Sequence, residues 1–245
     1  MEFKTKEDRI NFKEGALLLI DKPLDWTSFD VVNKVRYKIR QRYGVKKFKV
    51  GHAGTLDPKA TGLLLLCTGK FTKKLSDLQG LSKTYTGTIK IGATTPTMDV
   101  EMEEDAHFPI DHITPELIEA TRKKFIGEID QFPPMFSAIK VDGIPLYKRA
   151  RNGESVEVKS RKITIHDFQI TRFEKDEIDF IVSSSKGTYI RSLAHDFGKA
   201  LKSGAYLTAL RRTKVEEYDI KDAWQLDELI SFIEKDPNIV IPTVD

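Results

Sequence analysis

The chain has 245 residues, of which 40% are hydrophobic and 31% are charged, and this composition provides a core for one domain or two small ones. No apolar run approaches the roughly 20 residues of a membrane-spanning helix, and the polar N-terminal residues lack the apolar centre of a secretory signal, so we expect neither a membrane nor a secreted protein. The single cysteine, Cys67, excludes an internal disulfide and is expected in the core, which fits a reducing cytoplasm.

The net charge of +3 is too small to indicate a polyanionic partner, but the charges are unevenly distributed. Residues 31–50 contain eight Lys or Arg and no acid, whereas residues 99–121 contain eight Asp or Glu and no Lys or Arg. A charge run is usually a solvated helix face. Because the basic run leads directly to the turn around Asp57, we interpret it as a phosphate-binding face, with the acidic stretch turned away from the ligand.

Turn residues and hydrophobic periodicity predict interspersed strands and helices, several strands being antiparallel, and therefore a single α+β domain over residues 1–245. Residues 131–153, rich in Pro and Gly, are predicted to form an extended, partly mobile excursion from this core. Ser28 is the expected N-cap of the first helix, and Gly44 its end. Strands are expected at 15–20, 48–50, 83–92, 163–172, 177–184 and 206–218, and helices at 28–43, from 114 onward, at 188–202 and at 224–233.

The most informative segment is the turn around Asp57, which lies directly before the apolar run Leu63–Leu66. Three glycines and a proline surround this carboxylate between residues 51 and 62, and such residues fix a backbone shape that an adjoining strand holds rigid. A lone acid on a rigid loop is suited to chemistry on a bound substrate. The alternative interpretation is an Asp that only closes its own turn.

A second candidate cluster lies at residues 186–191, where a glycine before a helix lets the loop approach a ligand closely. Arg191 lies about one turn into that helix and is a candidate partner for Asp57, whose pKa it would lower. The alternative is a surface arginine paired with another acid. Tyr85 and Tyr189 are candidates for stacking on a base, although a strand tyrosine is more often part of the core.

Other common site types have no counterpart in the sequence. The five histidines lack a paired ligand spacing, so no metal site is predicted. No phosphate-binding or dinucleotide-binding glycine motif is present, and no Ser or Cys lies in a nucleophile elbow. A carboxylate, aromatic residues and arginines remain as candidate site residues.

These segments resemble, in order and approximate spacing, the TruB family of tRNA pseudouridine synthases, over about residues 15–215. The Asp57 motif is the most specific of them. The matching segments are Asp21-Lys22-Pro23 with Trp26-Thr27-Ser28, Gly51 to Asp57, Lys83-Thr84-Tyr85, Lys186 to Arg191, and Leu210-Arg211-Arg212.

The resemblance implies a pseudouridine synthase catalytic fold, with a central mixed, mostly antiparallel sheet flanked by helices and loops. It implies isomerisation of the uridine at position 55, in the T-loop of tRNA, without cofactor or metal and without an obligatory protein partner. Residues 131–153 would be a mobile segment that grips the T-stem-loop, and no separate C-terminal RNA-binding (PUA) domain is expected. By the same resemblance Asp57, Tyr85 and Arg191 are catalytic, while His52, Tyr189, Leu210 and Lys22 bind the substrate, with His52 filling the gap left by the flipped nucleotide.

One departure from the family pattern is Asp25, which stands where relatives have glycine, so this turn must avoid a positive φ or tolerate a non-glycine residue. A single carboxylate is consistent with isomerisation and less so with hydrolysis, for which glycosidases generally use two, so a base-excising glycosylase is disfavoured. The remaining alternatives are a tRNA-binding or folding chaperone without catalysis, and a pseudouridine synthase that acts on another RNA.

Overall fold

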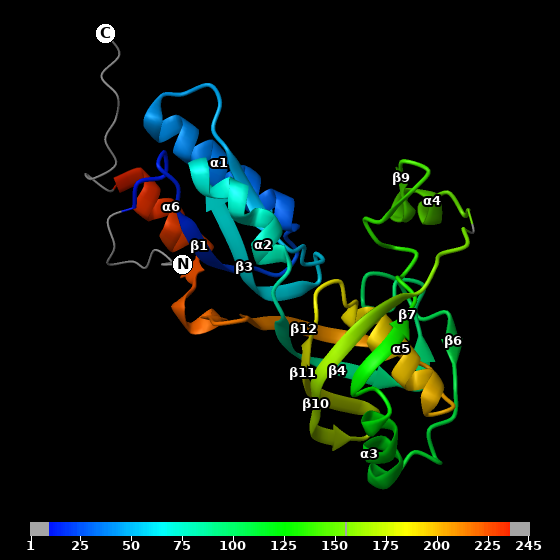
Figure 1. Ribbon diagram of the computed structural model, residues 1–245. Helices are drawn as coiled ribbons and strands as arrows, with labels where there is room; N and C mark the ends of the chain where they lie inside the picture. The colour runs from blue at the N-terminus through cyan, green and yellow to red at the C-terminus, as the bar shows by residue number, and fades with distance from the viewer. Residues whose placement is uncertain (1–9, 155, 236–245) are drawn as a thin grey trace. The chain divides into compact units, whose positions relative to one another are not determined.

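The computed structural model describes residues 10–154 and 156–235, and their contacts form two compact units. Unit 1 comprises the described residues up to Thr84 and from Arg211 onward, and unit 2 comprises Tyr85–Leu210. Two strands, β4 (Lys83–Ile91) and β12 (Ala205–Val215), carry the chain from one unit to the other (Figure 1).

Unit 1 is built on a sheet with the strand order β14-β1-β3-β12, in which β2 also pairs with β3 and β13 with β12. β1 and β3 are antiparallel, with Leu17 opposite Cys67 and Lys22 opposite Gly62, whereas β14 runs parallel to β1. Its strands are β1 (Leu17–Lys22), β2 (Val50–Ala53), β3 (Ala60–Thr68), β13 (Tyr218–Asp219) and β14 (Trp224–Gln225). Its helices are α1 (Ser28–Tyr43), α2 (Leu75–Gln79) and α6 (Leu226–Lys235), with 3-10 turns η1 (Gly69–Lys74) and η2 (Ile220–Asp222).

The apolar runs of β1 and β3 are continuous because both faces of this sheet are covered. On one face Leu18 and Ile20 pack with α1 and α6, which lie side by side in Figure 1. On the other face Leu17 and Leu19 pack with α2 and with Cys67, which is fully buried as expected. Since successive strand residues point to opposite faces, one short strand supplies both cores.

The first helix begins at Ser28, and its N-cap is Thr27 and not Ser28 as expected. Thr27 and Asp30 form a reciprocal capping box, in which each side chain accepts a hydrogen bond from the other residue's backbone. Gly44 ends the helix in the left-handed conformation, with φ +62°, as its position in the sequence predicted. Ser28 is buried and has a different partner, which the site below describes.

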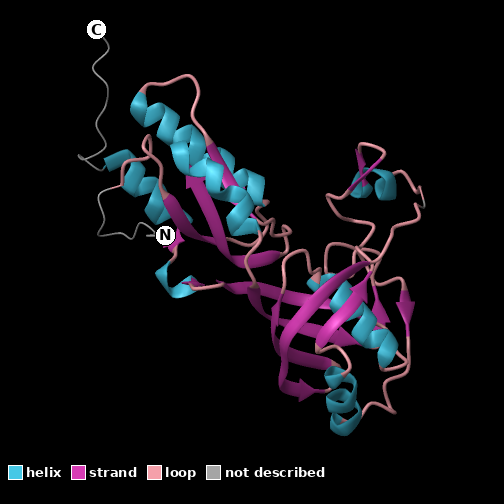
Figure 2. Cartoon of the chain, in the orientation of Figure 1, coloured by secondary structure: helices cyan, strands magenta, loops and turns pink. Residues whose placement is uncertain are grey.

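Unit 2 is built on the strand order β12-β4-β11-β10-β7, and β10 is antiparallel to both of its neighbours. Figure 2 shows helices beside these strands, and α3 and α5 are in contact with one another. Phe168 of β10 stacks edge-on against Phe180 and Phe197, at 6.0 and 5.6 Å between ring centroids. The elements are β5 (Ala93–Thr94), β6 (Ala106–His107), α3 (Pro115–Lys123), β7 (Gly127–Gln131), β10 (Arg161–Glu174), β11 (Glu177–Ser184) and α5 (Ile190–Ala200).

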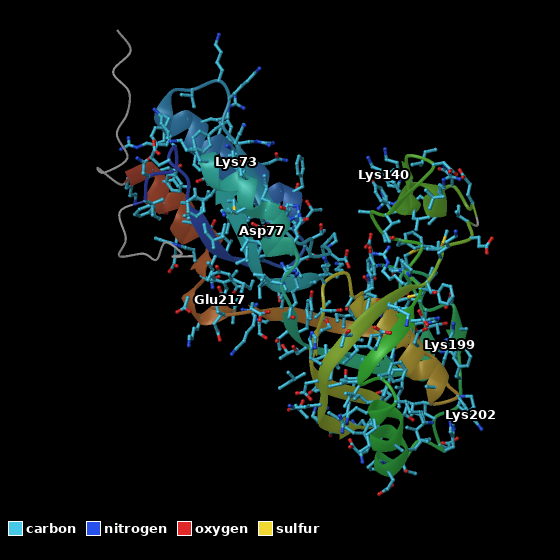
Figure 3. All side chains as sticks on the ribbon, in the orientation of Figure 1. Lys73, Asp77, Lys140, Lys199, Lys202 and Glu217 are labelled. Atoms are coloured by element: carbon cyan, nitrogen blue, oxygen red, sulfur yellow. The ribbon has the colours of Figure 1, made fainter. Side chains whose placement is uncertain are left out.

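The excursion at 131–153 is not simply extended. It contains a small hairpin, β8 (Lys140–Val141) and β9 (Ile144–Pro145), followed by the helix α4 (Leu146–Arg151). Lys140 lies on this hairpin (Figure 3). Backbone hydrogen bonds fold the segment onto itself, for example from the Leu146 N–H to the Ile139 carbonyl at 2.7 Å. Local pairing therefore supplies the structure that the Pro and Gly content obscured.

The α+β class is confirmed, as are most of the predicted elements. Their ends were less predictable: the strand expected at 48–50 is Val50–Ala53, and the helix expected from 188 begins at Ile190 because Tyr189 is still extended. The last helix begins at Leu226, because Trp224 and Gln225 pair with β1. Within the described residues, no helix has both the length and the apolar character to cross a membrane.

Candidate functional site

Asp57 lies in the loop between β2 and β3 of unit 1 and is half-buried. The loop leaves β2 through Gly54, whose φ of +90° suits glycine. It closes at the start of β3, where the Ala60 N–H donates to the Asp57 carbonyl at 3.1 Å. Asp57 thus closes its turn through its backbone carbonyl.

The residue before Asp57 is held by Ser28. The Leu56 N–H donates to the Ser28 hydroxyl at 2.8 Å, and the same hydroxyl donates to the Leu56 carbonyl at 3.1 Å. Both residues are buried, so these bonds are shielded from competing water. The first turn of α1 therefore fixes the backbone immediately before the candidate catalytic acid.

Lys22, at the end of β1, is fully buried and lies beside the same loop. Its ammonium donates to the carbonyls of Pro23 at 2.8 Å, Trp26 at 2.5 Å and Pro58 at 3.5 Å. Burial lowers the pKa of Lys22 to about 8, and the nearby carboxylate of Asp57 opposes this shift. Lys22 therefore joins two loops and places a positive charge near Asp57.

The turn at Asp25 answers the question that the sequence left open. Asp25 adopts the left-handed conformation with φ +63°, so a non-glycine residue is tolerated there. Its N–H donates to the Pro58 carbonyl at 2.9 Å, and its carboxylate pairs with the Lys59 ammonium at 2.8 Å. Asp is among the few residues that adopt this conformation readily, and here it adds a second connection to the Asp57 loop.

Arg212 is a residue whose role sequence reasoning missed, although it belongs to a recognised motif. Its guanidinium is fully buried and donates to the carbonyls of Leu63 at 2.7 Å and Gly54 at 3.1 Å. A Cβ on Gly62 would lie 2.3 Å from the Arg212 carbonyl oxygen, so β12 needs glycine at this position in β3. The adjacent Arg211 instead forms a bidentate pair with Asp21, at 3.0 and 2.6 Å.

His52 lies on β2, in the same unit as Asp57, and is half-buried. Burial lowers the pKa of His52 from its ordinary value, and the positive charge of Arg212 lowers it further. The imidazole is therefore neutral at neutral pH. A neutral ring is suited to packing against bases rather than to pairing with phosphate.

Unit 2 contains the other predicted residues. Tyr85 lies on β4 and is 8% exposed, and Leu210 lies on β12 and is half-buried. Tyr189 is the N-cap of α5, and the guanidinium of Arg161 lies 5.9 Å from its ring centroid. A cation at this distance interacts favourably with the ring face.

Arg191, in the first turn of α5, is buried rather than at the surface. Its guanidinium donates to the carbonyls of Thr97 and Phe136, both at 2.9 Å. The carboxylate of Asp99 lies 3.7 Å from its Nε. Asp99 belongs to the acidic stretch of the sequence, but it is buried and does not lie on a solvated surface. The reason is that the carboxylate neutralises a buried guanidinium.

Gln131 links the start of the excursion to the start of α5, a connection that the sequence did not indicate. Its buried amide accepts from the Tyr189 N–H at 2.8 Å and donates to the Tyr189 carbonyl at 3.0 Å. Nearby, the Ser192 hydroxyl donates to the Phe132 carbonyl at 2.8 Å. Together with the bond from Arg191 to Phe136, these contacts attach the first residues of the excursion to the start of α5.

Unit 1 brings together Lys22, His52 and Asp57, and unit 2 contains Tyr85, Tyr189, Arg191 and Leu210. Among the residues that the structure describes, no three His, Cys, Asp or Glu side chains gather as metal ligands would. The loop that carries Asp57 is instead held by hydrogen bonds that Ser28 of α1, Lys22 of β1 and Arg212 of β12 donate to its carbonyls.

Two family models match the chain. Residues 40–190 match the N-terminal domain of the TruB family of pseudouridylate synthases, and residues 191–238 match the C-terminal domain of tRNA pseudouridylate synthase B. A tRNA pseudouridine synthase B from Flavobacterium johnsoniae is 64% identical, with 86% of this chain and 93% of the relative covered. One from Phocaeicola vulgatus is 50% identical, with 92% and 96% covered. Among solved structures, a chain of a Cbf5–Nop10–Gar1 complex superimposes with a TM-score of 0.68 at 27% identity, over 94% of this chain and 58% of that chain.

Proposed function

This chain belongs to the TruB family of pseudouridylate synthases, and we propose that it converts the uridine at position 55, in the T-loop of tRNA, to pseudouridine. The enzyme is an isomerase that modifies tRNA, and its fold is the pseudouridine synthase α+β fold. The observation that carries the proposal is the identity of 64% to a tRNA pseudouridine synthase B along 93% of that protein's length.

The reaction breaks the bond between N1 of uracil and C1′ of the ribose, turns the base, and forms a bond from C5 to the same carbon. The proton of C5 is lost and N1 gains one, so no redox partner or leaving group is needed. Because both reacting atoms lie within the base stack, the nucleotide must first be flipped out. A T-loop is a favourable target, since its bases are partly unpaired already.

Asp57 is proposed as the essential catalytic group. Breaking the glycosidic bond develops positive charge on the ribose, as in glycoside hydrolysis. An ionised carboxylate there can stabilise this charge, attack the ribose or remove a ribose proton, and all three roles require a fixed position. The bonds from Ser28 and Lys22 to the residues on either side of Asp57 support such a position. The positive charge of Lys22 favours the ionised form of the acid.

Arg191 is proposed as the partner that orients Asp57, and Tyr85 as the residue that stacks on the flipped uracil and manages a proton. A base on an aromatic ring gains roughly 1–3 kcal/mol, which offsets part of the unstacking cost. Tyr189 and Leu210 would line the uracil site. His52 would fill the space that the flipped nucleotide vacates, for which its neutral ring is suited.

Lys22 was expected to bind substrate, and we propose that it does so through the Asp57 loop, whose backbone its ammonium holds. The excursion at 131–153 is proposed to grip the T-stem-loop. The whole chain would act as one catalytic domain in the cytoplasm, with no cofactor and no obligatory protein partner. The basic residues 34–49 would contact phosphates, so binding should weaken with salt.

The test is tritium release from tRNA transcript labelled at uracil C5, since forming the new bond at C5 expels the label. Wild-type protein should release one equivalent without added metal or nucleotide, and release should stop when the T-loop uridine is replaced. Asp57→Asn should bind tRNA nearly as tightly and release nothing. Turnover by Asp57→Asn would remove this residue from the mechanism. Tight binding without release by the wild type would favour the chaperone or another RNA substrate.

A further inference from the structure

The helix α1 exposes two aromatic rings to solvent. Phe29 is 59% exposed and Tyr37 is 58% exposed. At 100° per residue, Arg36 and Arg40 lie on the same side of the helix as these rings. We call these four residues the α1 stripe. The adjoining side of the helix is buried through Val31, Val32, Val35, Ile39 and Tyr43.

The α1 stripe is partly ordered before any ligand binds. The Arg36 guanidinium lies 5.7 Å from the Phe29 ring centroid and donates to the side-chain carbonyl of Asn33. Arg36 is thus held across the ring in an extended position. Guanidinium planes and aromatic rings at the surface are the groups on which unpaired bases stack.

The α1 stripe also carries uncompensated positive charge. The helix has one acid, Asp30, and its carboxylate is used in the capping box at the N-terminus. Lys38, on another side of the helix, pairs with Glu234 of α6. Within residues 10–154 and 156–235, no carboxylate pairs with Arg36 or Arg40. Aromatic rings interleaved with free cations match the bases and phosphates of single-stranded RNA better than they match an apolar protein surface.

The position of the α1 stripe relates it to the candidate active site in the same unit. The helix begins at Ser28, whose hydroxyl bonds Leu56, the residue before Asp57. Phe29 therefore lies at the end of α1 that holds the catalytic loop. From Phe29 to Arg40 the helix rises about 16 Å, at about 1.5 Å per residue. The stripe thus leads away from the loop that acts on the flipped uridine.

We propose that the α1 stripe binds unpaired nucleotides of the substrate, which stack against Phe29 and Tyr37 while their phosphates pair with Arg36 and Arg40 of the basic run already proposed to contact phosphates. This inference rests on the proposed function, because it assumes that the substrate is an RNA with unpaired bases beside the target. It assigns the aromatic residues of α1 to affinity, and not to chemistry.

The experiment compares dissociation constants for full-length tRNA transcript and for an isolated T-stem-loop. Phe29→Ala/Tyr37→Ala should weaken binding at least about 25-fold, since each of the two stacked bases contributes roughly a fivefold or greater factor. Phe29→Trp/Tyr37→Trp keeps the stacking surfaces and should bind within about twofold of wild type. Weaker binding of both RNAs would place the stacked nucleotides in the T-loop. Weaker binding of full-length tRNA alone would place them elsewhere in the tRNA.

The arginines are tested by charge. Arg36→Gln/Arg40→Gln should reduce the slope of log K against log salt concentration by about two, because two phosphate contacts are lost. The matched control Lys123→Gln/Lys124→Gln, at the end of α3, should leave this slope unchanged. Affinity of Phe29→Ala/Tyr37→Ala within twofold of wild type for both RNAs would overturn the proposal and leave a protein partner as the alternative occupant. The two proposals are tested by different measurements. If the wild type releases no tritium, the proposed function is wrong, but the effect of the α1 stripe on RNA affinity still tests the second proposal.

Discussion

The hydroxyl of Ser28 satisfies both backbone groups of Leu56, accepting from its N–H at 2.8 Å and donating to its carbonyl at 3.1 Å. Ser28→Ala leaves both groups buried without this partner, at a cost of about 1–3 kcal/mol in the free energy of unfolding. Because the neighbouring residue is Asp57, we also expect kcat to fall while KM for tRNA stays within about twofold. Denaturant unfolding and tritium-release kinetics test both effects. Ser28→Thr retains the hydroxyl as a control, and an unchanged kcat in Ser28→Ala would show that the loop is held without it.

The low pKa of Lys22, about 8 against an ordinary 10.5, predicts a pH dependence of stability. Between these values the unfolded chain binds a proton at this site that the folded protein does not, so the contribution of Lys22 to stability increases as the pH rises from 8 to 10.5. The increase is at most about 3 kcal/mol, at about 1.4 kcal/mol per pKa unit.

The measurement is the difference in unfolding free energy between wild type and Lys22→Met at pH 8 and at pH 10.5. Burial raises the pKa of Cys67 to about 12, which lowers the stability of both proteins equally at high pH and cancels in this difference. A difference that stays constant with pH would mean that the folded Lys22 titrates near its ordinary value.

Because Asp25 has a φ of +63°, we expect two substitutions that both remove its ion pair with Lys59 to differ in their effect on stability. Alanine is strained in this conformation and glycine is not, so Asp25→Gly should be about 1 kcal/mol more stable than Asp25→Ala. Thermal unfolding of the two variants is the measurement. Equal stabilities would show that the turn changes conformation when Asp25 is replaced.

Gln131 predicts a link between the excursion and the start of α5, because its amide holds both backbone groups of Tyr189. Gln131→Ala should increase hydrogen exchange at the Tyr189 amide by about tenfold, since a net hydrogen bond contributes roughly 1 kcal/mol or more. We expect kcat to fall as well, because Arg191 follows in the same turn. Gln131→Glu keeps the acceptor for the Tyr189 N–H and should retain most of the protection of this amide against exchange. Fast exchange in both variants would show that the bond from the Gln131 amide to the Tyr189 carbonyl is the one that matters.

Tyr85→Phe removes a hydroxyl and keeps a ring that is 8% exposed, so the fold should be little affected. If the hydroxyl manages a proton during rejoining, product formation should fall by about 10²-fold or more while tRNA affinity is retained. Single-turnover tritium release separates the two quantities. Full activity of Tyr85→Phe would leave stacking as the role of this residue.

The sequence predicted what local patterns determine. The spacing of Val32, Val35 and Ile39 identified α1, and Gly44 marked its end. The prediction of the N-cap was wrong because Thr27 and Ser28 are both good capping residues. The choice between them depends on the contact of Ser28 with Leu56, which is remote in the chain.

Contacts between distant positions gave no such signal. Asp99 precedes Arg191 by 92 positions, and a buried acid in an otherwise exposed acidic stretch looks like its neighbours in sequence. The bonds from Gln131 to Tyr189 join residues 58 positions apart. The pairing of Arg191 with Asp57 stays a prediction, as do the catalytic roles of the site residues.

Gly54 and Arg212 are hydrogen-bonded although 158 positions separate them. A ribosome adds about 5–20 residues per second, so roughly 10–30 s pass between the synthesis of the Asp57 loop and that of the strand that supports it. Until β12 emerges, the carbonyls of Gly54 and Leu63 lack their guanidinium donor. The nascent chain can therefore display its candidate catalytic aspartate before β12 supplies the support of the loop.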